Sequence, residues 1–154
     1  MIIGFTGTQQ GLSFEQRETL ADVLENSDFD IAMHGDCIGA DRDFHDIVRN
    51  LDFDVKVVVF PSNIEGKRAF CDADSVMDSA DPLVRNAAIA QLCDTLIACP
   101  KEFSEVLRSG TWATVRYAMK AQKTIVLILP DGVPILCVAA EPIAASIARQ
   151  ARLN

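Results

Sequence analysis

The chain has 154 residues, of which 49% are hydrophobic and 23% charged, a composition typical of one globular domain with a substantial core. Asp and Glu number 22 against 14 Lys and Arg, giving a formal net charge of −8, which makes nucleic acid an unlikely partner because its binding depends on cations that displace counterions. No apolar run approaches the ~20 residues of a membrane helix, and the first residues lack the basic flank and the length of a signal peptide. We therefore expect a single domain over residues 1–154, in the cytoplasm and without membrane contact.

Apolar runs bounded by turn residues alternate with helical periodicity along the chain, a pattern typical of βαβ units around a parallel sheet. Strands are expected at residues 1–5, 30–34, 55–60, 95–99 and 124–129, with a short one at 134–138. The sequence therefore predicts an α/β fold: a three-layer, Rossmann-like, doubly wound and mostly parallel sheet with helices on both faces.

Several helix starts carry local signals. Ser13 and Gln16 form a capping box, so the first helix should begin near residue 13 after a long loop. Asp81 and Pro82 supply an N-cap and a first-turn proline for a helix through "LVRNAAIAQLC". Residues 61–81, which precede the second of these helices, show no clean helical or strand periodicity of apolar residues, which indicates a binding loop.

Two Gly-Thr pairs mark the predicted ligand site. In a doubly wound sheet the strand order reverses at one point and leaves a crevice beyond the carboxyl ends of the strands. If the first strand lies there, Gly7 and Thr8 face Gly110 and Thr111. Ser109, Gly110 and Thr111 stand directly before a helix, where free N–H groups suit a phosphate, although Ser109 or Thr111 could equally serve only as a cap.

A third glycine-containing loop, "HGDCIGAD" at 34–41, follows the second strand. Asp41 lies in a first helical turn, where it would either favour the helix dipole or bind ribose hydroxyls. The spacing of Asp41, His45 and Arg49 is typical of a solvated helix face.

Arg85 lies one turn inside an almost uniformly apolar helix, so it should have an anionic partner, either Asp94 or a ligand phosphate. Asn86 beside it could bind a base or a ribose. Trp112 belongs to an apolar helix face, which favours a place in the core over stacking on a base.

The five cysteines are scattered, with no close pair suited to zinc, and we expect no metal and no cofactor. Cys93, Cys99 and Cys137 are predicted to be core residues. Cys37 and Cys71 lie in loops that could border a ligand.

Five stretches in register, "GFTGT", "HGDCIGAD", "VVVFPSN", "PLVRNAAIAQLCDTLIACP" and "SGTWATVRYA", resemble the SLOG superfamily of Rossmann-like nucleotide-binding domains over roughly residues 1–130. Its relatives include the LOG family, often labelled lysine decarboxylase-like, and the YspA-like and DprA families. The Gly-Ala-Asp at 39–41 and the Arg-Asn pair at 85–86 match YspA-like motifs.

The resemblance implies that the chain binds or senses a nucleotide or a nucleotide-derived, phosphoribosyl ligand, and that it forms a homodimer or a larger homo-oligomer. The expected ligand-binding residues are Gly7, Thr8, Gly35, Asp36, Gly39, Asp41, Arg85, Asn86, Ser109, Gly110 and Thr111.

The alternative function is that of LOG phosphoribohydrolases, which cleave the N-glycosidic bond of a nucleoside monophosphate with a glutamate and an arginine. Arg85 aligns with that arginine, but the glutamate position falls on Ala113 or Thr114. A methyl group or a hydroxyl cannot replace a carboxylate at an oxocarbenium-like centre. If the chain is such an enzyme, Arg85 and Glu105 are the predicted catalytic residues, with Asp41 and Glu102 as other possible carboxylates.

Overall fold

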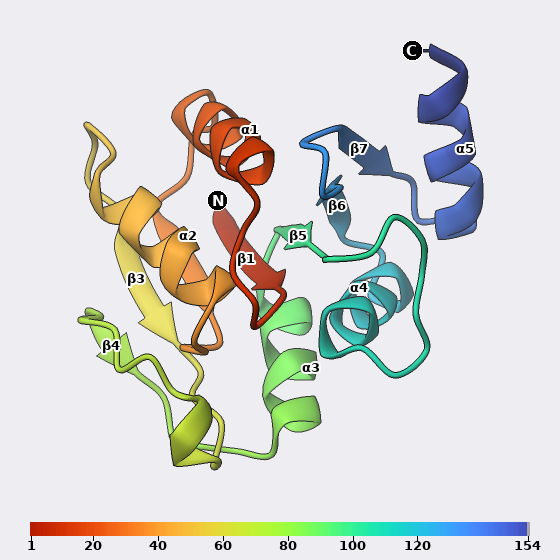
Figure 1. Ribbon diagram of the computed structural model, residues 1–154. Coiled ribbons are helices and arrows are strands. Elements are labelled where there is room, and N and C mark those ends of the chain that lie inside the picture. The colour runs from red at the N-terminus through yellow and green to blue at the C-terminus, as the bar shows by residue number, and fades with distance from the viewer. Residues whose placement is uncertain (154) are drawn as a thin grey trace.

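Seven strands form one sheet in the order β4-β3-β2-β1-β5-β6-β7 in the computed structural model, which describes residues 1–153 (Figure 1). All neighbouring strands are parallel except β6 and β7. The expected α/β fold with a mostly parallel sheet is therefore confirmed. The strands are β1 (Ile2–Gly7), β2 (Ile31–His34), β3 (Lys56–Val59), β4 (Ser75–Val76), β5 (Thr95–Cys99), β6 (Thr124–Ile128) and β7 (Pro134–Cys137).

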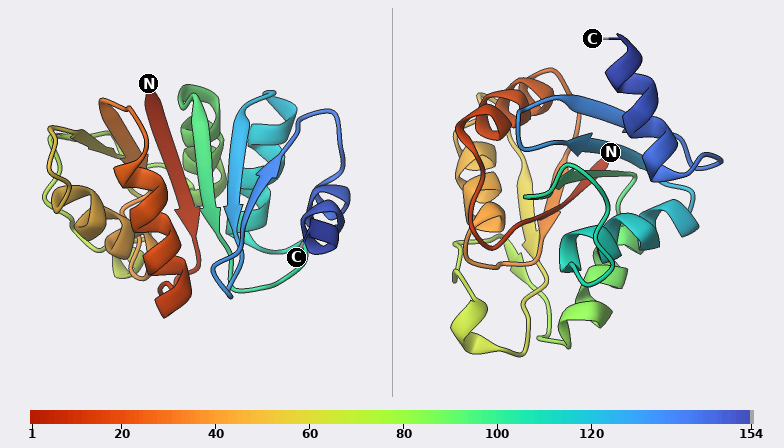
Figure 2. Two further views of the ribbon diagram at one scale, coloured as in Figure 1. Left: turned by 90° about the horizontal axis from the view of Figure 1, so that it is seen from above. Right: turned by 45° about the vertical axis from the view of Figure 1, so that its right-hand side comes forward.

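Helices cover both faces of the sheet, so the fold has three layers (Figure 2). One face carries α1 (Phe14–Glu25) and α2 (Ala40–Arg49), the other carries α3 (Pro82–Leu92) and α4 (Gly110–Lys120), and α5 (Ile143–Leu153) packs beside β7. Two apolar clusters fill the layers, and Trp112 is fully buried in the second, as the sequence favoured. Cys93, Cys99 and Cys137 are also buried, as predicted.

The predicted helix starts are present. The Ser13 side chain accepts a hydrogen bond from the Gln16 backbone N–H (3.0 Å), and the Gln16 side chain accepts one from the Ser13 N–H (3.1 Å). Asp81 caps α3 through the N–H of Leu83. Ser109 caps α4 through the N–H of Trp112. Each cap satisfies an N–H group that the helix leaves without an internal partner.

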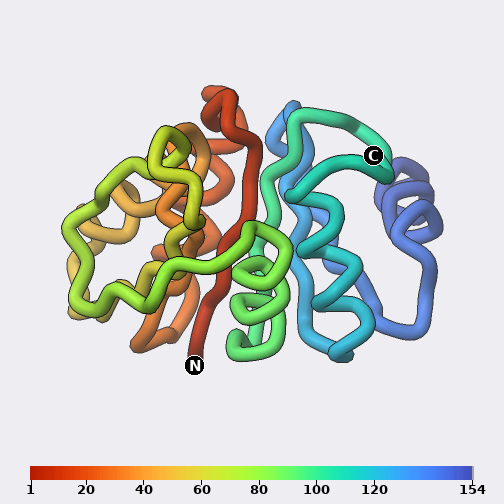
Figure 3. The backbone as a smooth tube through the Cα atoms, turned by 90° about the horizontal axis from the view of Figure 1, so that it is seen from below, coloured from red at the N-terminus to blue at the C-terminus, as the bar shows by residue number. Residues whose placement is uncertain are grey.

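β1 extends two residues beyond the predicted strand, because Thr6 and Gly7 pair with Ala98 and Cys99 of β5. The strand order reverses between β1 and β5: β2, β3 and β4 follow β1 toward one edge of the sheet, and β6 and β7 follow β5 toward the other edge. The loops after β1 and β5 therefore meet at the carboxyl edge of the sheet (Figure 3), which is where a doubly wound fold leaves its crevice.

Residues 61–81, expected to form a binding loop, instead contain a short 3-10 helix (Glu65–Lys67) and β4, which pairs with β3 at the edge of the sheet. None of these residues lines the pocket described below. A strand of two residues is too short for its alternation of side chains to be seen in sequence.

None of the helices within residues 1–153 is both long enough and apolar enough to cross a lipid bilayer.

Candidate functional site

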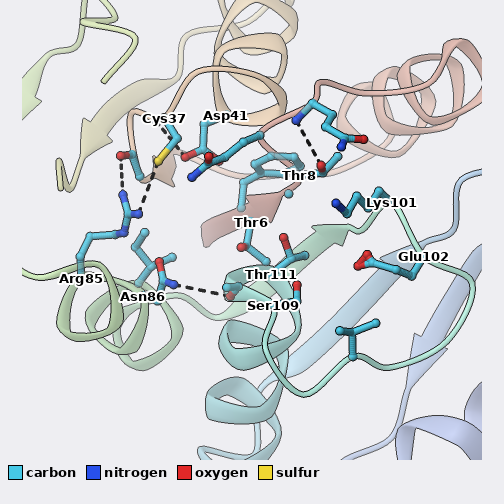
Figure 4. A pocket seen from close by; sticks show the side chains of 18 of the residues that line it. Thr6, Thr8, Cys37, Asp41, Arg85, Asn86, Lys101, Glu102, Ser109 and Thr111 are labelled. Atoms are coloured by element: carbon cyan, nitrogen blue, oxygen red, sulfur yellow. Dashed lines mark hydrogen bonds between the residues drawn. The ribbon is translucent and has the colours of Figure 1, made fainter. Parts of the chain in front are cut away.

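A cavity of about 510 Å³ opens at the carboxyl ends of β1 and β5. Nine of the eleven residues predicted to bind the ligand line it: Gly7, Thr8, Gly35, Asp41, Arg85, Asn86, Ser109, Gly110 and Thr111. Figure 4 shows Arg85, Cys37 and Asp41 on one side and Lys101 and Glu102 on the other, with Thr6, Ser109 and Thr111 between them. Pockets that hold small molecules have volumes of about 300–1,000 Å³, so the cavity is large enough for a nucleotide-sized ligand.

The loop after β1 is fixed by its neighbours. A Cβ at Gly7 would lie 2.5 Å from the Ala40 Cβ and 3.2 Å from the Cys99 carbonyl oxygen, so glycine lets α2 and β5 approach the strand. The Thr8 N–H donates to the Cys99 carbonyl (3.2 Å), and the Thr8 carbonyl accepts from the Ala40 N–H (2.9 Å). This wall of the pocket is therefore rigid.

The start of α4 forms the floor of the pocket. Ser109, Gly110 and Thr111 all line it, and a helix start carries free N–H groups and a partial positive charge. Lys101 and Arg108, from the loop between β5 and α4, line the same cavity and take part in none of the ion pairs among residues 1–153. Two cations and a helix N-terminus therefore line one cavity, and neither cation is paired with a carboxylate among the described residues.

Arg85 holds the opposite wall together. Its Nη1 donates to the carbonyl oxygens of Gly35 (2.6 Å) and Phe60 (3.2 Å), and its Nη2 lies 3.4 Å from the Cys37 Sγ. Asp94, one of the two anionic partners considered for Arg85, does not pair with it, because the Asp94 carboxylate accepts from the Ile2 N–H at the other end of the sheet (2.7 Å). Arg85 therefore joins the loops after β2 and β3 to α3 through one backbone carbonyl of each loop.

Asn86, next to Arg85 on α3, reaches toward the start of α4. Its Nδ2 lies 3.5 Å from the Gly110 carbonyl oxygen, at the long limit for a hydrogen bond. The amide therefore keeps most of its hydrogen-bonding capacity for a ligand.

Asp41 is a buried carboxyl group in this wall. Its Oδ2 accepts from the Cys37 N–H at 3.1 Å. Burial raises the pKa of Asp41 to about 6, although the nearby Arg85 charge acts in the opposite direction. Burial and the Asp41 charge also raise the pKa of the Cys37 thiol, which keeps it protonated.

Asp36 and Gly39, also predicted to bind the ligand, lie outside the lining of the pocket. The fully buried Asp36 carboxylate accepts from Arg68 (2.8 Å to Nη2) and from the Cys71 N–H (2.8 Å), so it fastens the loop after β2 to residues 68–71. Gly39 has φ of 90°, and a Cβ there would collide with the Gln9 backbone. Both residues shape the site without facing its cavity.

Glu105, one of the two predicted catalytic residues, does not line the pocket. Its exposed carboxylate pairs with Arg116 (2.8 Å). Glu102 does line it, with Oε1 accepting from the Trp112 Nε1–H at 3.3 Å. Thr114 is one of the two positions, with Ala113, that the resemblance gives to the LOG glutamate; its hydroxyl donates to the Gly110 carbonyl (2.8 Å), and the residue is fully buried.

The predicted solvated face at Asp41, His45 and Arg49 is wrong for the first two residues, which are 6% and 4% exposed. His45 is instead packed against His34, with 3.0 Å between His34 Nε2 and His45 Nδ1. Burial lowers the pKa of His34 to about 3 and also lowers that of His45.

Cys71 lies beside this histidine pair, and ligand atoms of the three side chains fall within 4.8 Å of one another. A metal would need free lone pairs on the nitrogens that face it. The Asp36 N–H donates to His34 Nδ1 (3.0 Å), so the hydrogen of His34 is on Nε2 and is donated to His45 Nδ1. Because ligating histidines normally donate their outer N–H rather than accept there, the arrangement fits a structural pair of neutral imidazoles better than a metal site.

Sequence reasoning missed Lys101, Arg108, Gln9 and Gln10 as lining residues. The two cations lie in a loop without periodicity, so nothing in the sequence gives their distance from the helix start. Gln9 and Gln10 directly follow the Gly-Thr pair, and the long loop before Ser13 was the signal that could have included them.

Compared with models of protein families and with curated proteins, the chain matches none of them.

Proposed function

We propose that the chain binds a nucleotide or a nucleotide-derived, phosphoribosyl ligand in the cavity at the carboxyl ends of β1 and β5, as its resemblance to the SLOG superfamily implies. One observation carries the proposal: the N-terminus of α4, Lys101 and Arg108 line the same cavity of about 510 Å³. Helix N-termini and unpaired cations favour phosphate. The remaining volume can hold a ribose and a base.

Isothermal titration with a panel of nucleoside monophosphates and pentose phosphates tests this function. Lys101→Ala and Arg108→Ala should each weaken binding about tenfold, because each removes a charged hydrogen-bond donor to the phosphate. Lys56→Ala is the matched control, since Lys56 is exposed at the amino end of β3, away from the cavity. Absence of heat and of thermal stabilisation with every phosphorylated ligand would refute the proposal.

Hydrolysis of an N-glycosidic bond is the second candidate, and the environment of Asp41 favours it. Asp41 and Glu102 are the carboxyl groups among the lining residues. A carboxyl group whose pKa is about 6 can donate a proton near neutral pH. Asp41 would then protonate the leaving base, and the second carboxylate would stabilise the sugar centre or activate water.

Chromatography of wild-type reactions with the common nucleoside monophosphates should, on this second candidate, show free base released with a rate that falls above about pH 6. Asp41→Asn should abolish release and leave ligand binding in place, because asparagine can still accept from the Cys37 N–H. Binding without any release of base would leave the first function and remove the second.

A further inference from the structure

Arg116 holds the loop between β5 and α4 from outside the cavity. Residues 100–109 form this loop, and Figure 1 shows it running beside the start of α4. The Arg116 Nη1 donates to the Glu105 carboxylate (2.8 Å) and to the Val106 carbonyl (3.4 Å), and its Nη2 donates to the Leu107 carbonyl (3.0 Å). One guanidinium group of α4 therefore binds three consecutive residues of the loop.

These hydrogen bonds reach the residue directly before Arg108. Arg108 follows Leu107 in the chain, lines the cavity and takes part in none of the ion pairs among residues 1–153. Residues 103–108 are exposed and belong to no helix or strand. Arg116 is not among the residues that line the cavity, so any effect that it has on a ligand is indirect.

A cation on an irregular, exposed loop binds an anion weakly if the loop must be ordered at the moment of binding. Ordering a long side chain and the backbone that carries it costs conformational entropy. Hydrogen bonds that already hold the backbone in the free protein remove part of this cost. The bonds from Arg116 to the Val106 and Leu107 carbonyls are of this kind, because they fix the backbone itself.

We propose that Arg116 is a positioning residue of the anion site, which raises the affinity for a phosphate group by holding Arg108 at the cavity. This inference rests on the proposed function, and it assigns no contact with the ligand to Arg116. Lys101 lies at the other end of the loop, next to Glu102, whose carboxylate accepts from the buried Trp112 (3.3 Å). The position of Lys101 should therefore not depend on Arg116.

Isothermal titration with adenosine 5′-monophosphate and with inorganic phosphate tests this inference. Arg116→Ala should weaken the binding of both probes about fivefold, less than the loss expected for Arg108→Ala, because the cation remains but is no longer held. Arg116→Lys keeps the charge but cannot span both carbonyls, so it should weaken binding almost as much as alanine. Lys120→Ala is the matched control, since it removes an exposed cation from the far end of the same helix, and it should bind both probes as the wild type does.

A double-mutant cycle separates positioning of Arg108 from a general loss of structure. In the Arg108→Ala background, Arg116→Ala should cause no further loss of affinity, because the cation that it positions is already absent. In the Lys101→Ala background the two losses should add. Urea unfolding of Arg116→Ala should give a midpoint close to that of the wild type, because its ion pair with Glu105 is partly exposed and such pairs contribute little to stability.

Each other outcome overturns the inference in a distinguishable way. If Arg116→Ala binds both probes as tightly as the wild type, or if Arg116→Lys keeps full affinity, the hydrogen bonds to the loop do not set the affinity and the proposed function stands. Equal losses from Arg116→Ala with and without Arg108 would show that Arg116 does not act through Arg108. If the wild type binds neither probe nor any other phosphorylated ligand, the proposed function fails, and this inference fails with it.

Discussion

Replacing Arg85 with alanine is expected to lower the free energy of unfolding by about 3 kcal/mol and to abolish ligand binding. Hydrogen bonds from a charged donor contribute about 1.5–3 kcal/mol each, and Arg85 donates to two carbonyls from two different loops. Its side chain is 7% exposed, and alanine would leave the buried bond to the Gly35 carbonyl and the partly buried bond to the Phe60 carbonyl without a donor. The loop that carries Gly35, Cys37 and Asp41 would lose its attachment to α3.

Urea unfolding measures the first effect, and titration of the folded variant measures the second. Arg85→Lys keeps the charge but cannot span both carbonyls, so it should fall between alanine and wild type. Arg42→Ala is the control, because Arg42 makes an exposed pair with Asp46 of the same helix, and such pairs contribute about 0–1 kcal/mol. An Arg85→Ala protein as stable as Arg42→Ala would show that the loop does not depend on the guanidinium group.

Acidification is expected to destabilise the protein through His34. The pKa of His34 is about 3 in the folded state against 6.5 for the ordinary side chain, so the unfolded chain takes up the proton first. Stability should therefore fall as the pH drops below about 6.5, by at most about 1.4 kcal/mol per pH unit for this group. Between pH 6.5 and pH 4 the loss from His34 alone is on the order of 3 kcal/mol.

Asp41 acts with the opposite sign. Its folded pKa of about 6 lies above the ordinary 3.8, so its contribution to stability is fully present below about pH 3.8 and is lost as the pH rises through 6. Between pH 6 and pH 4 it therefore offsets part of the loss caused by His34. The free energy of unfolding of the wild type should still decrease as the pH is lowered, because the pKa of His45 is also lowered in the folded state and its effect adds to that of His34.

Urea unfolding at pH 4, 5, 6 and 7 of wild type and His34→Asn measures the His34 contribution as a difference of slopes. Asparagine cannot titrate, and its side-chain oxygen can still accept from the Asp36 N–H that His34 Nδ1 now binds. The variant should lose less stability with acid than wild type, whatever its stability at pH 7. Parallel curves for the two proteins would contradict the assigned pKa shift.

Much of the fold follows from local sequence. The strand that includes Thr95 was predicted with its true bounds, and the caps at Ser13 and Asp81 formed as expected, because alternation and capping depend on neighbouring residues. That Gly7 and Gly110 line the same cavity was also predictable, since it needs only the reversal of strand order between β1 and β5.

The rest depends on partners that are distant in sequence. The burial of Asp41 and His45 results from Arg85, His34 and Asp36 packing around them, and helix spacing alone could not distinguish this face from a solvated one. Glu102 and Glu105 are three residues apart in one irregular loop, and the choice between them depends on Trp112 and Arg116. No periodic pattern could have separated these two carboxylates.

The two sides of the cavity differ in how many sequence changes they can tolerate. Gly35, Asp41 and Arg85 are joined by hydrogen bonds between their segments, so a change that removes one of these hydrogen bonds disturbs the scaffold. Residues 103–108 are exposed and join the body of the protein through side chains such as Arg116. Grafting loops of other sequence between Glu102 and Ser109 would therefore offer a route to new ligand selectivity on an unaltered framework.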